Sequence, residues 1–382
     1  MGSAKYQSKY QHWYYVFIVA IALVATGCSN SPDVSYSSQQ NQYDPLSTQL
    51  LFVSNQDGDR EIFLTNFAGD ELKQLTYNNR DDYDASWSPD GQHILFTSLR
   101  DNGNSEIYTM RVDGSQQRNL SNHAGYDGQA RWSPDGQSIV FNSDRHGGIG
   151  LYLMSANGEH VKRLSKDEPD SYVHPAWSPN GKWLSYSKVR PNGKSNIWIV
   201  NSDGTIHQQL STHLKSEEGQ VHWSPDSQKL LYHARRNRIY NIYLYDLTAN
   251  TERQLTDLKA ADSRPKWSNK GDKIVFLSTR GPLGRTQLFT MKEDGSQLKS
   301  LTDARYQVDD AIWQLDDNAL FFVSWQNGQG SNVYWLELST DKQRAISPAK
   351  GYQSQPIPEP AALPKFLSKV RNPERDMRSL RQ

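Results

Sequence analysis

Ala130-Arg131-Trp132-Ser133-Pro134-Asp135-Gly136 is the clearest copy of a motif that recurs along this chain. Close copies stand at Ser86-Trp87-Ser88-Pro89-Asp90-Gly91, Ala176-Trp177-Ser178-Pro179-Asn180-Gly181 and His222-Trp223-Ser224-Pro225-Asp226-Ser227, and degraded copies at Lys266-Trp267-Ser268-Asn269-Lys270-Gly271 and Ile312-Trp313-Gln314-Leu315-Asp316-Asp317. The six tryptophans, Trp87, Trp132, Trp177, Trp223, Trp267 and Trp313, follow one another at intervals of 44 to 46 residues. A fixed period of roughly 40–50 residues indicates a repeat architecture.

Each repeat predicts four short strands. The strand that ends on tryptophan is followed by a tight Ser-Pro-Asp-Gly turn and then by apolar runs such as 93–98 and 106–111. An Asp-Gly turn, such as Asp113-Gly114, precedes a last strand that ends in Leu-Ser or Leu-Thr. One such sheet cannot bury both of its apolar faces, whereas sheets stacked around an axis can, so the repeat favours a β-propeller. We expect the tryptophans to pack between blades, not to form a ligand platform.

The number of repeats predicts seven blades over residues 48–358. Seven second strands occur, but the first of them, at 50–54, has no tryptophan strand before it. Residues 351–360 can supply the missing strand, because Ile357 lies 44 residues after Trp313 and Pro358 matches the turn proline. The sequence therefore predicts an all-β, seven-bladed propeller of four-stranded blades, closed by a C-terminal strand. Six blades is the alternative, if the degraded unit at 313–347 is something else.

The amino terminus predicts export and lipid anchoring. Val16 to Ala25 is an apolar run of ten residues, too short to span a bilayer and typical of a signal-peptide core. Cys28 follows it and is the only cysteine, so an intramolecular disulfide is excluded. This arrangement resembles the bacterial lipoprotein signal, which implies a signal peptide at 1–27, an acylated Cys28 and delivery to the periplasmic face of the outer membrane, since Ser29 replaces the Asp of retained lipoproteins. An ordinary secretory signal, or a short anchor with a free thiol, is the alternative.

The segments that flank the ring have their own composition. Residues 28–47 are rich in Ser, Gln, Asn and Tyr and predict a flexible tether. Residues 359–382 form a basic C-terminal tail, which we interpret as a solvated terminus, with a partner-binding arm as the alternative.

The order of Trp-Ser-Pro-Asp-Gly, a strand ending in Ser, Ile-Tyr, Asp-Gly and Leu-Ser or Leu-Thr resembles the TolB-like (WD40-like) propeller family. The resemblance implies the propeller fold and, by analogy with TolB, a periplasmic protein whose partner is the peptidoglycan-associated lipoprotein. The chain departs from the TolB pattern in three expected ways: a lipid anchor, no additional amino-terminal domain, and seven blades where TolB has six. These departures put the transfer of the TolB partner in doubt, and fold alone does not fix function.

Candidate binding residues stand just before the tryptophans. The residues three positions before them are Asp84, Gln129, His174, Gln220, Arg264 and Asp310, with Ser354 in the proposed closing strand. Two positions earlier stand Asp82, Asp127, Tyr172, Glu218, Asp262 and Val308, with Tyr352 in the closing strand. Strand alternation predicts that both sets lie on the same side of the strand, at one mouth of the ring. Trp325, His174, His222 and His233 break the repeat and are the stronger candidates for a ligand site.

A second register carries arginine. Arg100, Arg145, Arg190, Arg236 and Arg280 follow the second strands, with Gln56 and Gln326 in the flanking blades. Because an arginine and an acid recur in blade after blade, we expect ion pairs between blades. A site for an anion or a peptide carboxylate is the alternative.

The function predicted from these features is binding. Within this sequence there is no Gly-x-Ser-x-Gly elbow, His-Glu-x-x-His motif, phosphate loop or zinc-ligand spacing, so we expect no enzyme, cofactor or metal. With 42 basic and 42 acidic residues, the chain shows no signature of nucleic-acid binding. We expect an envelope lipoprotein that touches the membrane only through its lipid and binds a protein or a peptidoglycan-linked lipoprotein. A propeller enzyme of the sugar lyase or lactonase type is the alternative.

Overall fold

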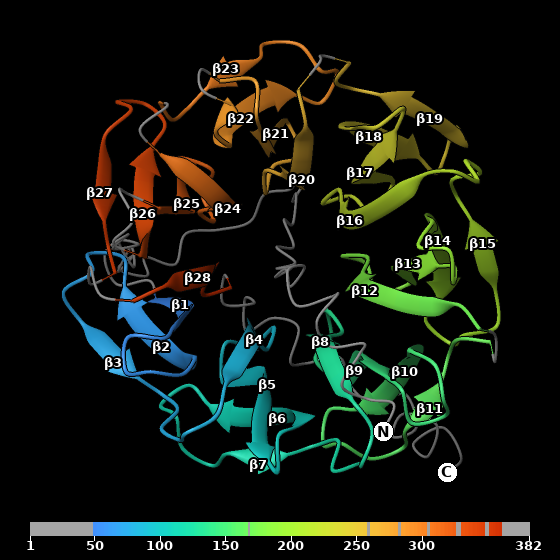
Figure 1. Cartoon of the computed structure of the whole chain (residues 1–382), viewed down its shortest axis with the longest axis vertical. Helices are drawn as coiled ribbons and strands as arrows, with labels where there is room; N and C mark the ends of the chain where they lie inside the picture. Colours follow the sequence, from blue (N-terminus) through green and yellow to red (C-terminus); the bar gives the residue numbers. More distant parts are fainter. Residues whose placement is uncertain are drawn as a thin grey trace, which may run out of the picture.

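The computed structural model describes residues 49–360, except 167–168, 258–259, 282–283, 304–305, 326–329 and 348–350. Within these residues, seven four-stranded antiparallel sheets stand around a common axis as the blades of a propeller (Figure 1). Blade 1 orders its strands as β28 (Gln353–Pro358), β1 (Gln49–Ser54), β2 (Glu61–Asn66) and β3 (Leu72–Gln74). The predicted fold class is therefore confirmed, and the six-bladed alternative is wrong.

The other six blades each use four consecutive strands, ordered from the centre of the ring outward. Blade 2 contains β4 (Asp82–Trp87), β5 (His93–Asp101), β6 (Asn104–Arg111) and β7 (Arg118–Asn119), and blade 3 contains β8 (Asp127–Trp132), β9 (Ser138–Ser143), β10 (Gly150–Ser155) and β11 (Lys162–Arg163). Blade 4 contains β12 (Ser171–Trp177), β13 (Trp183–Val189), β14 (Ser195–Asn201) and β15 (His207–Gln209), and blade 5 contains β16 (Glu217–Trp223), β17 (Lys229–Arg236), β18 (Ile239–Asp246) and β19 (Thr251–Gln254). Blade 6 contains β20 (Asp262–Trp267), β21 (Lys273–Ser278), β22 (Gln287–Lys292) and β23 (Lys299–Ser300), and blade 7 contains β24 (Gln307–Trp313), β25 (Ala319–Trp325), β26 (Ser331–Glu337) and β27 (Gln343–Ala345).

The two ends of the repeat region share blade 1. In Figure 1 the red strand β28 lies beside the blue strand β1, and the two pair antiparallel. Leu50 lies opposite Pro358, just as Ile94 lies opposite Trp87 in blade 2. Pro358 therefore occupies the tryptophan position, and the prediction that gave this position to Ile357 and the turn to Pro358 was wrong by one residue.

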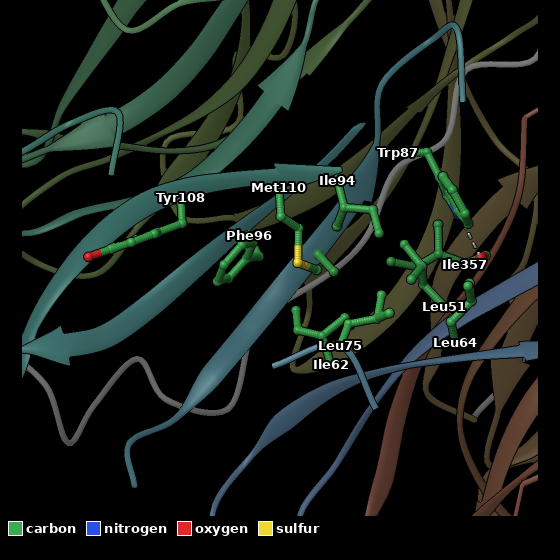
Figure 2. Close-up of a cluster of buried hydrophobic side chains, with 11 residues drawn as sticks. Leu51, Ile62, Leu64, Leu75, Trp87, Ile94, Phe96, Tyr108, Met110 and Ile357 are labelled. Carbon is green, nitrogen blue, oxygen red and sulfur yellow. Dashed lines mark hydrogen bonds between the residues drawn. The ribbon is translucent and has the colours of Figure 1, made fainter. Parts of the chain in front are cut away.

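Tryptophan and its neighbours pack between adjacent blades. Trp87 lies in a buried cluster whose other members come from blade 1 and blade 2, as Figure 2 shows: Leu51, Ile62, Leu64, Leu75, Ala85, Ile94, Phe96, Tyr108, Met110 and Ile357. Its indole N–H donates to the carbonyl of Ile357 at 3.1 Å. The equivalent bonds run from Trp223 to the Ala176 carbonyl and from Trp313 to the Lys266 carbonyl. Each of these bonds ties one inner strand to the inner strand of the preceding blade.

Every inner strand carries a one-residue β-bulge in its pairing with the second strand. In six blades the residue three positions before the tryptophan position has a positive φ of 53° to 57°, and we call this the bulge position: Asp84, Gln129, His174, Gln220, Arg264 and Gln355. The predicted alternation between this residue and the one two positions earlier fails, because the bulge interrupts the strand. The two positions therefore contact different neighbours.

Candidate binding site

The mouth of the ring at which the inner strands begin carries the predicted site residues. We call it the entry mouth. The second of the two predicted sets is buried at all six positions, which are Asp82, Asp127, Tyr172, Glu218, Asp262 and Val308. Gln353, 2% exposed, takes the seventh position that the sequence had suggested for Tyr352. Similarly, Gln355 takes the bulge position suggested for Ser354.

The recurring arginines pair with acids of their own blade, which corrects the prediction of ion pairs between blades. The pairs are Arg100 with Asp82 at 2.7 Å, Arg145 with Asp127 at 2.9 Å, Arg236 with Glu218 at 2.9 Å and Arg280 with Asp262 at 2.6 Å. The geometry follows from the sheet, because the acid lies at the start of the inner strand and the arginine lies at or just beyond the end of the neighbouring antiparallel strand. These acids are fully buried, and burial raises the pKa of Asp127 while Ser143 and Arg145 oppose the rise.

Blade 4 replaces this pair with a different arrangement. Lys188 pairs with Asp170 at 3.3 Å and lies 5.6 Å from the centre of the Tyr172 ring. Arg190 donates to the side-chain oxygen of Asn196 instead of an inner-strand acid. In blades 2, 3, 5 and 6 the arginines form ion pairs with the buried acids, so they have a structural role. The alternative of a free anion site at these four arginines is therefore not supported.

Two buried ion pairs do connect blades. Asp84 of blade 2 pairs with Arg131 of blade 3 at 2.9 Å, and Lys266 of blade 6 pairs with Asp310 of blade 7 at 2.8 Å. Burial raises the pKa of Asp84, and the charge of Arg131 opposes that rise. Removing one partner of such a pair leaves a buried charge without an opposite charge beside it, which lowers the stability of the fold strongly. Asp84 and Asp310, both predicted as binding residues, thus lie in structural contacts between inner strands.

The glutamines at the bulge position also connect blades, with one exception. Gln355 accepts the backbone N–H of Asp84 at 3.0 Å, and Gln129 accepts that of His174 at 2.8 Å. By the same pattern Gln220 of blade 5 would accept the N–H of Arg264. That N–H instead donates to Nδ1 of His233 at 3.4 Å.

His233 lies opposite Gly219 in the pairing of β16 with β17. Gln220 is 4% exposed, and neither atom of its amide has a hydrogen-bond partner within the described part of the chain. Sequence reasoning singled out Gln220 and His233 separately. It could not connect them, because the pairing of Gly219 with His233 depends on the bulged register.

Burial keeps two histidines of blade 5 uncharged. It lowers the pKa of His233 to about 3, with the charges of His174 and Arg264 adding to the effect. Burial also lowers the pKa of His222 to about 3, followed by the charge of Lys266. His222 accepts the backbone N–H of Trp267 at 3.3 Å, so it ties blade 5 to blade 6.

An aromatic pair lies at the entry mouth between blades 7 and 1. Trp325 and Tyr352 are 37% and 51% exposed, and their ring centres are 4.9 Å apart. The indole N–H of Trp325 donates to the carboxylate of Asp309. Burial raises the pKa of Asp309, although this hydrogen bond and the charge of Arg264 lower it. Sequence reasoning found Trp325 as a break in the repeat but placed Tyr352 one position too far into the strand.

Two features are absent from the described residues. They contain no group of three or more His, Cys, Asp or Glu side chains placed to hold a metal ion. Nor do they contain a helix long and apolar enough to cross a membrane. Cys28, the proposed tether and the residues from 361 onward lie outside the described part of the chain.

Comparison with known proteins gives several relatives in sequence. A protein of uncharacterised function from Agrobacterium fabrum is 31% identical over 130 residues, which cover 34% of this chain and 43% of that protein. A TolB homologue from Chlorobium luteolum is 24% identical over 311 residues, which cover 81% of this chain and 59% of the homologue. The chain thus spans only about half the length of these two curated relatives.

Solved structures share the fold. TolB from Acinetobacter baumannii aligns with a TM-score of 0.56 at 16% identity, over 83% of this chain and 68% of that one. An oligogalacturonate lyase in complex with manganese aligns with a TM-score of 0.64 at 17% identity, over 77% of this chain and 87% of the lyase. At such identities the likeness is one of fold, and both a TolB and an enzyme have it.

The family assignment comes from the sequence profile of the TolB beta propeller domain. That profile matches residues 98–221 and 167–362, which together make up more than half of the chain. The chain therefore belongs to the TolB β-propeller domain family.

Proposed function

We propose that this propeller is a non-enzymatic binding platform of the bacterial cell envelope, and that its entry mouth binds a protein or a peptidoglycan-associated partner. The aromatic pair Trp325–Tyr352 carries this proposal. Elsewhere at this mouth, buried acids and arginines satisfy one another within their blades. The aromatic pair instead remains exposed where blade 7 meets blade 1.

The chemistry of the aromatic pair suits an interface. Exposed tryptophan and tyrosine provide large contact areas with few side-chain torsions to fix, and they are enriched where binding energy concentrates. Asp309 holds the indole N–H of Trp325, which fixes the ring before a partner arrives. A preorganised aromatic surface loses less conformational entropy on binding than a mobile one.

The proposed location adds a lipid anchor at Cys28. An acylated Cys28 followed by a tether of about twenty residues would hold the ring near the periplasmic face of the outer membrane. Under this proposal the lipid is the only contact with the membrane, and the entry mouth stays available to partners in the periplasm.

Cross-linking in intact cells tests the binding proposal. The full chain, carrying an affinity tag, is cross-linked in its own envelope and purified, and the attached proteins and peptidoglycan fragments are identified. We expect the double variant Trp325→Ala, Tyr352→Ala to recover its specific partner about tenfold less well, since aromatic anchors of an interface contribute at least that much.

The matched control is Tyr77→Ala. Tyr77 is 73% exposed and has no ring partner among the aromatic contacts of the described residues, and its hydroxyl donates only to the Gln74 carbonyl. This control should recover the partner as well as the unaltered chain does. Equal recovery by the double variant would remove the aromatic pair from the interface, and an unaltered chain that recovers no specific partner would contradict the binding proposal itself.

A further inference from the structure

Two adjacent blades lack the ion pair that recurs elsewhere at the entry mouth. Blades 2, 3, 5 and 6 each pair an arginine at the end of the second strand with an acid at the start of the inner strand. In blade 1 these two positions hold Gln56 and Gln353, and in blade 7 they hold Gln326 and Val308. Because blades 7 and 1 are neighbours in the ring, both charges of the pair are missing on the two sides of one junction (Figure 1).

Three segments of backbone meet closely at this junction. A methyl group built on Gly330 would collide with the carbonyl oxygen of Gly351, and one built on Gly351 would lie 2.9 Å from the backbone nitrogen of Gln56. The backbone N–H of Tyr352 donates to the side-chain oxygen of Asn55 at 2.6 Å, and that of Asn55 donates to the carbonyl of Tyr352 at 3.2 Å. The segments before β26, before β28 and after β1 are therefore held against one another.

The junction exposes aromatic rings and amides. The rings of Trp325 and Tyr352 meet at 48° and form one aromatic surface, and Asp309 holds the indole of Trp325 by its edge, not by its face. Asn55 and Gln56 are partly exposed in the segment that contacts Tyr352. The side-chain amide of Gln56 forms no hydrogen bond with another described residue, whereas the side-chain oxygen of Asn55 holds the Tyr352 backbone. Aromatic faces and an amide are thus the groups available to a ligand.

We propose that this junction binds an uncharged sugar chain, the glycan of peptidoglycan, through the Trp325–Tyr352 surface and the Gln56 side chain. This inference rests on the proposed binding function and adds the chemical class of the partner. A pyranose ring has a face of C–H groups and a rim of hydroxyl groups. The C–H face matches the electron-rich face of an aromatic ring. A hydroxyl both donates and accepts hydrogen bonds, and so does the side-chain amide of glutamine.

The charged side chains in the segment after β1 are paired or partly buried. Asp57 accepts a hydrogen bond from Gln74 of the outer strand β3 at 2.8 Å, and Arg60 pairs with Asp81 at 2.7 Å. One carboxylate oxygen of Asp59 is buried, and burial raises the pKa of this acid. A charged ligand loses water at an interface and needs an opposite charge in return. An uncharged ligand has no such requirement, so the junction favours a neutral sugar over a charged peptide.

Titration of the full chain with two matched sugar chains tests this inference. The probes are chitotetraose, an uncharged chain of N-acetylglucosamine, and its deacetylated form, in which every acetamide is an ammonium group. Fluorine-labelled tryptophan is followed by ¹⁹F NMR, and the resonance lost in Trp325→Phe is that of Trp325. We expect chitotetraose to shift this resonance saturably and with the same affinity at about 0.05 M and about 0.5 M NaCl, because no ion pair is screened. The deacetylated form should bind about tenfold more weakly.

Purified peptidoglycan identifies the source of the sugar. The full chain should sediment with it, and chitotetraose, which has the same kind of N-acetylated backbone, should release the chain. A protein that binds chitotetraose but does not sediment with peptidoglycan would overturn peptidoglycan as the source.

A double variant separates binding from folding. Gln56→Arg with Gln353→Asp gives blade 1 the ion pair of blades 2, 3, 5 and 6. Ser54, Phe52 and Phe63 stand where the equivalent side chains of blade 2 contact its arginine. We therefore expect the melting temperature to hold while the affinity for chitotetraose falls about fivefold, since the Gln56 amide is gone.

A second variant tests the aromatic surface. Tyr352→Leu removes a ring that is 51% exposed and should lower the affinity for chitotetraose about tenfold. Tyr77→Leu is the matched control, because Tyr77 is an exposed tyrosine outside the junction, and it should bind chitotetraose as the unaltered chain does.

The outcomes are distinct. No saturable shift, a deacetylated form that binds as well as chitotetraose, a steep dependence on salt, or unchanged affinity in Tyr352→Leu would each overturn the sugar site. If the double variant melts at a lower temperature, Tyr352→Leu decides alone. If chitotetraose does not bind while cross-linking recovers a protein through the aromatic pair, the binding platform stands and the sugar site falls. If the unaltered chain recovers neither a protein nor peptidoglycan, the binding platform itself falls.

Discussion

Glu61 shows how a single buried residue makes the stability of the ring depend on pH. It lies in β2, is fully buried and accepts the N–H of Asn78 at 2.8 Å. Burial raises the pKa of its carboxyl from 4.5 to about 8, Thr76 and Asn78 oppose the rise, and Asp82 adds to it. Between these two pH values the folded chain holds a proton that the unfolded chain has released, so stability falls as the pH rises through this window.

We therefore predict that Glu61→Gln weakens this dependence. Glutamine has the shape of the protonated acid and stays uncharged, so the variant should lose less stability between about pH 5 and about pH 8, by up to ~1.4 kcal/mol per pH unit. Urea unfolding at both ends of the window measures the effect. Glu71→Gln, at an exposed position, is the control. If the pH profile of Glu61→Gln runs parallel to that of the unaltered chain, Glu61 is not the source.

Single residues also explain what the sequence could not foretell about the candidate site. The bulge recurs in every inner strand, so it leaves the interval between tryptophans unchanged. The residues at positive φ include Gln129, Gln220 and Arg264, whose types rarely adopt this conformation and so do not mark the bulge in the sequence. Without the bulge the pairing of Gly219 with His233 is invisible, and Gln220 looks equivalent to Gln129. Symmetry-breaking residues could be named from the sequence, but not their partners.

At the scale of strands, the sequence was most informative where the sequence signal for a turn is strongest. Trp-Ser-Pro-Asp-Gly gives a strand end and a turn together, and the strands that end at Trp87 and Trp132 end where this motif predicts. The closing strand was placed in the right blade but one residue out of register. Gln353–Pro358 has no tryptophan and two prolines, so spacing alone had to set its register.

β28 provides a prediction about closure. It covers the edge of β1, and its Ile357 carbonyl accepts the indole N–H of Trp87 from blade 2. Removing residues 353–382 should expose that edge and lower the melting temperature by about 10 °C or more, with aggregation on heating. Removing only residues 361–382 leaves β28 in place and should keep the melting temperature. Calorimetry and light scattering of both truncations decide the matter, and equal melting temperatures would mean that the ring does not depend on β28.

At the scale of the whole molecule, the ring combines a repeated framework with one irregular sector. Ion pairs within blades recur in blades 2, 3, 5 and 6, and they hold the loops of the entry mouth in similar positions. The irregular features run from His174 in blade 4 through Gln220 and Arg264 to Trp325 and Tyr352 at the junction of blades 7 and 1. A partner that binds this sector has one orientation on the nearly seven-fold ring. The repeated blades do not carry the same residues, so they do not provide equivalent binding positions.

The last prediction concerns the location of the ring in the cell, which the proposed lipid anchor at Cys28 determines. If Cys28 is acylated, more than one acyl chain should fix the protein stably to the membrane, at ~0.8 kcal/mol per buried CH₂. Cys28→Ser removes the only thiol of the chain, so the variant should move from the membrane fraction to the soluble fraction while its melting temperature stays the same. Cell fractionation and mass spectrometry of the amino-terminal peptide measure this. Cys28→Ala is a second variant with the same expected result, and membrane retention of both would show that something other than a lipid on Cys28 holds the ring in place.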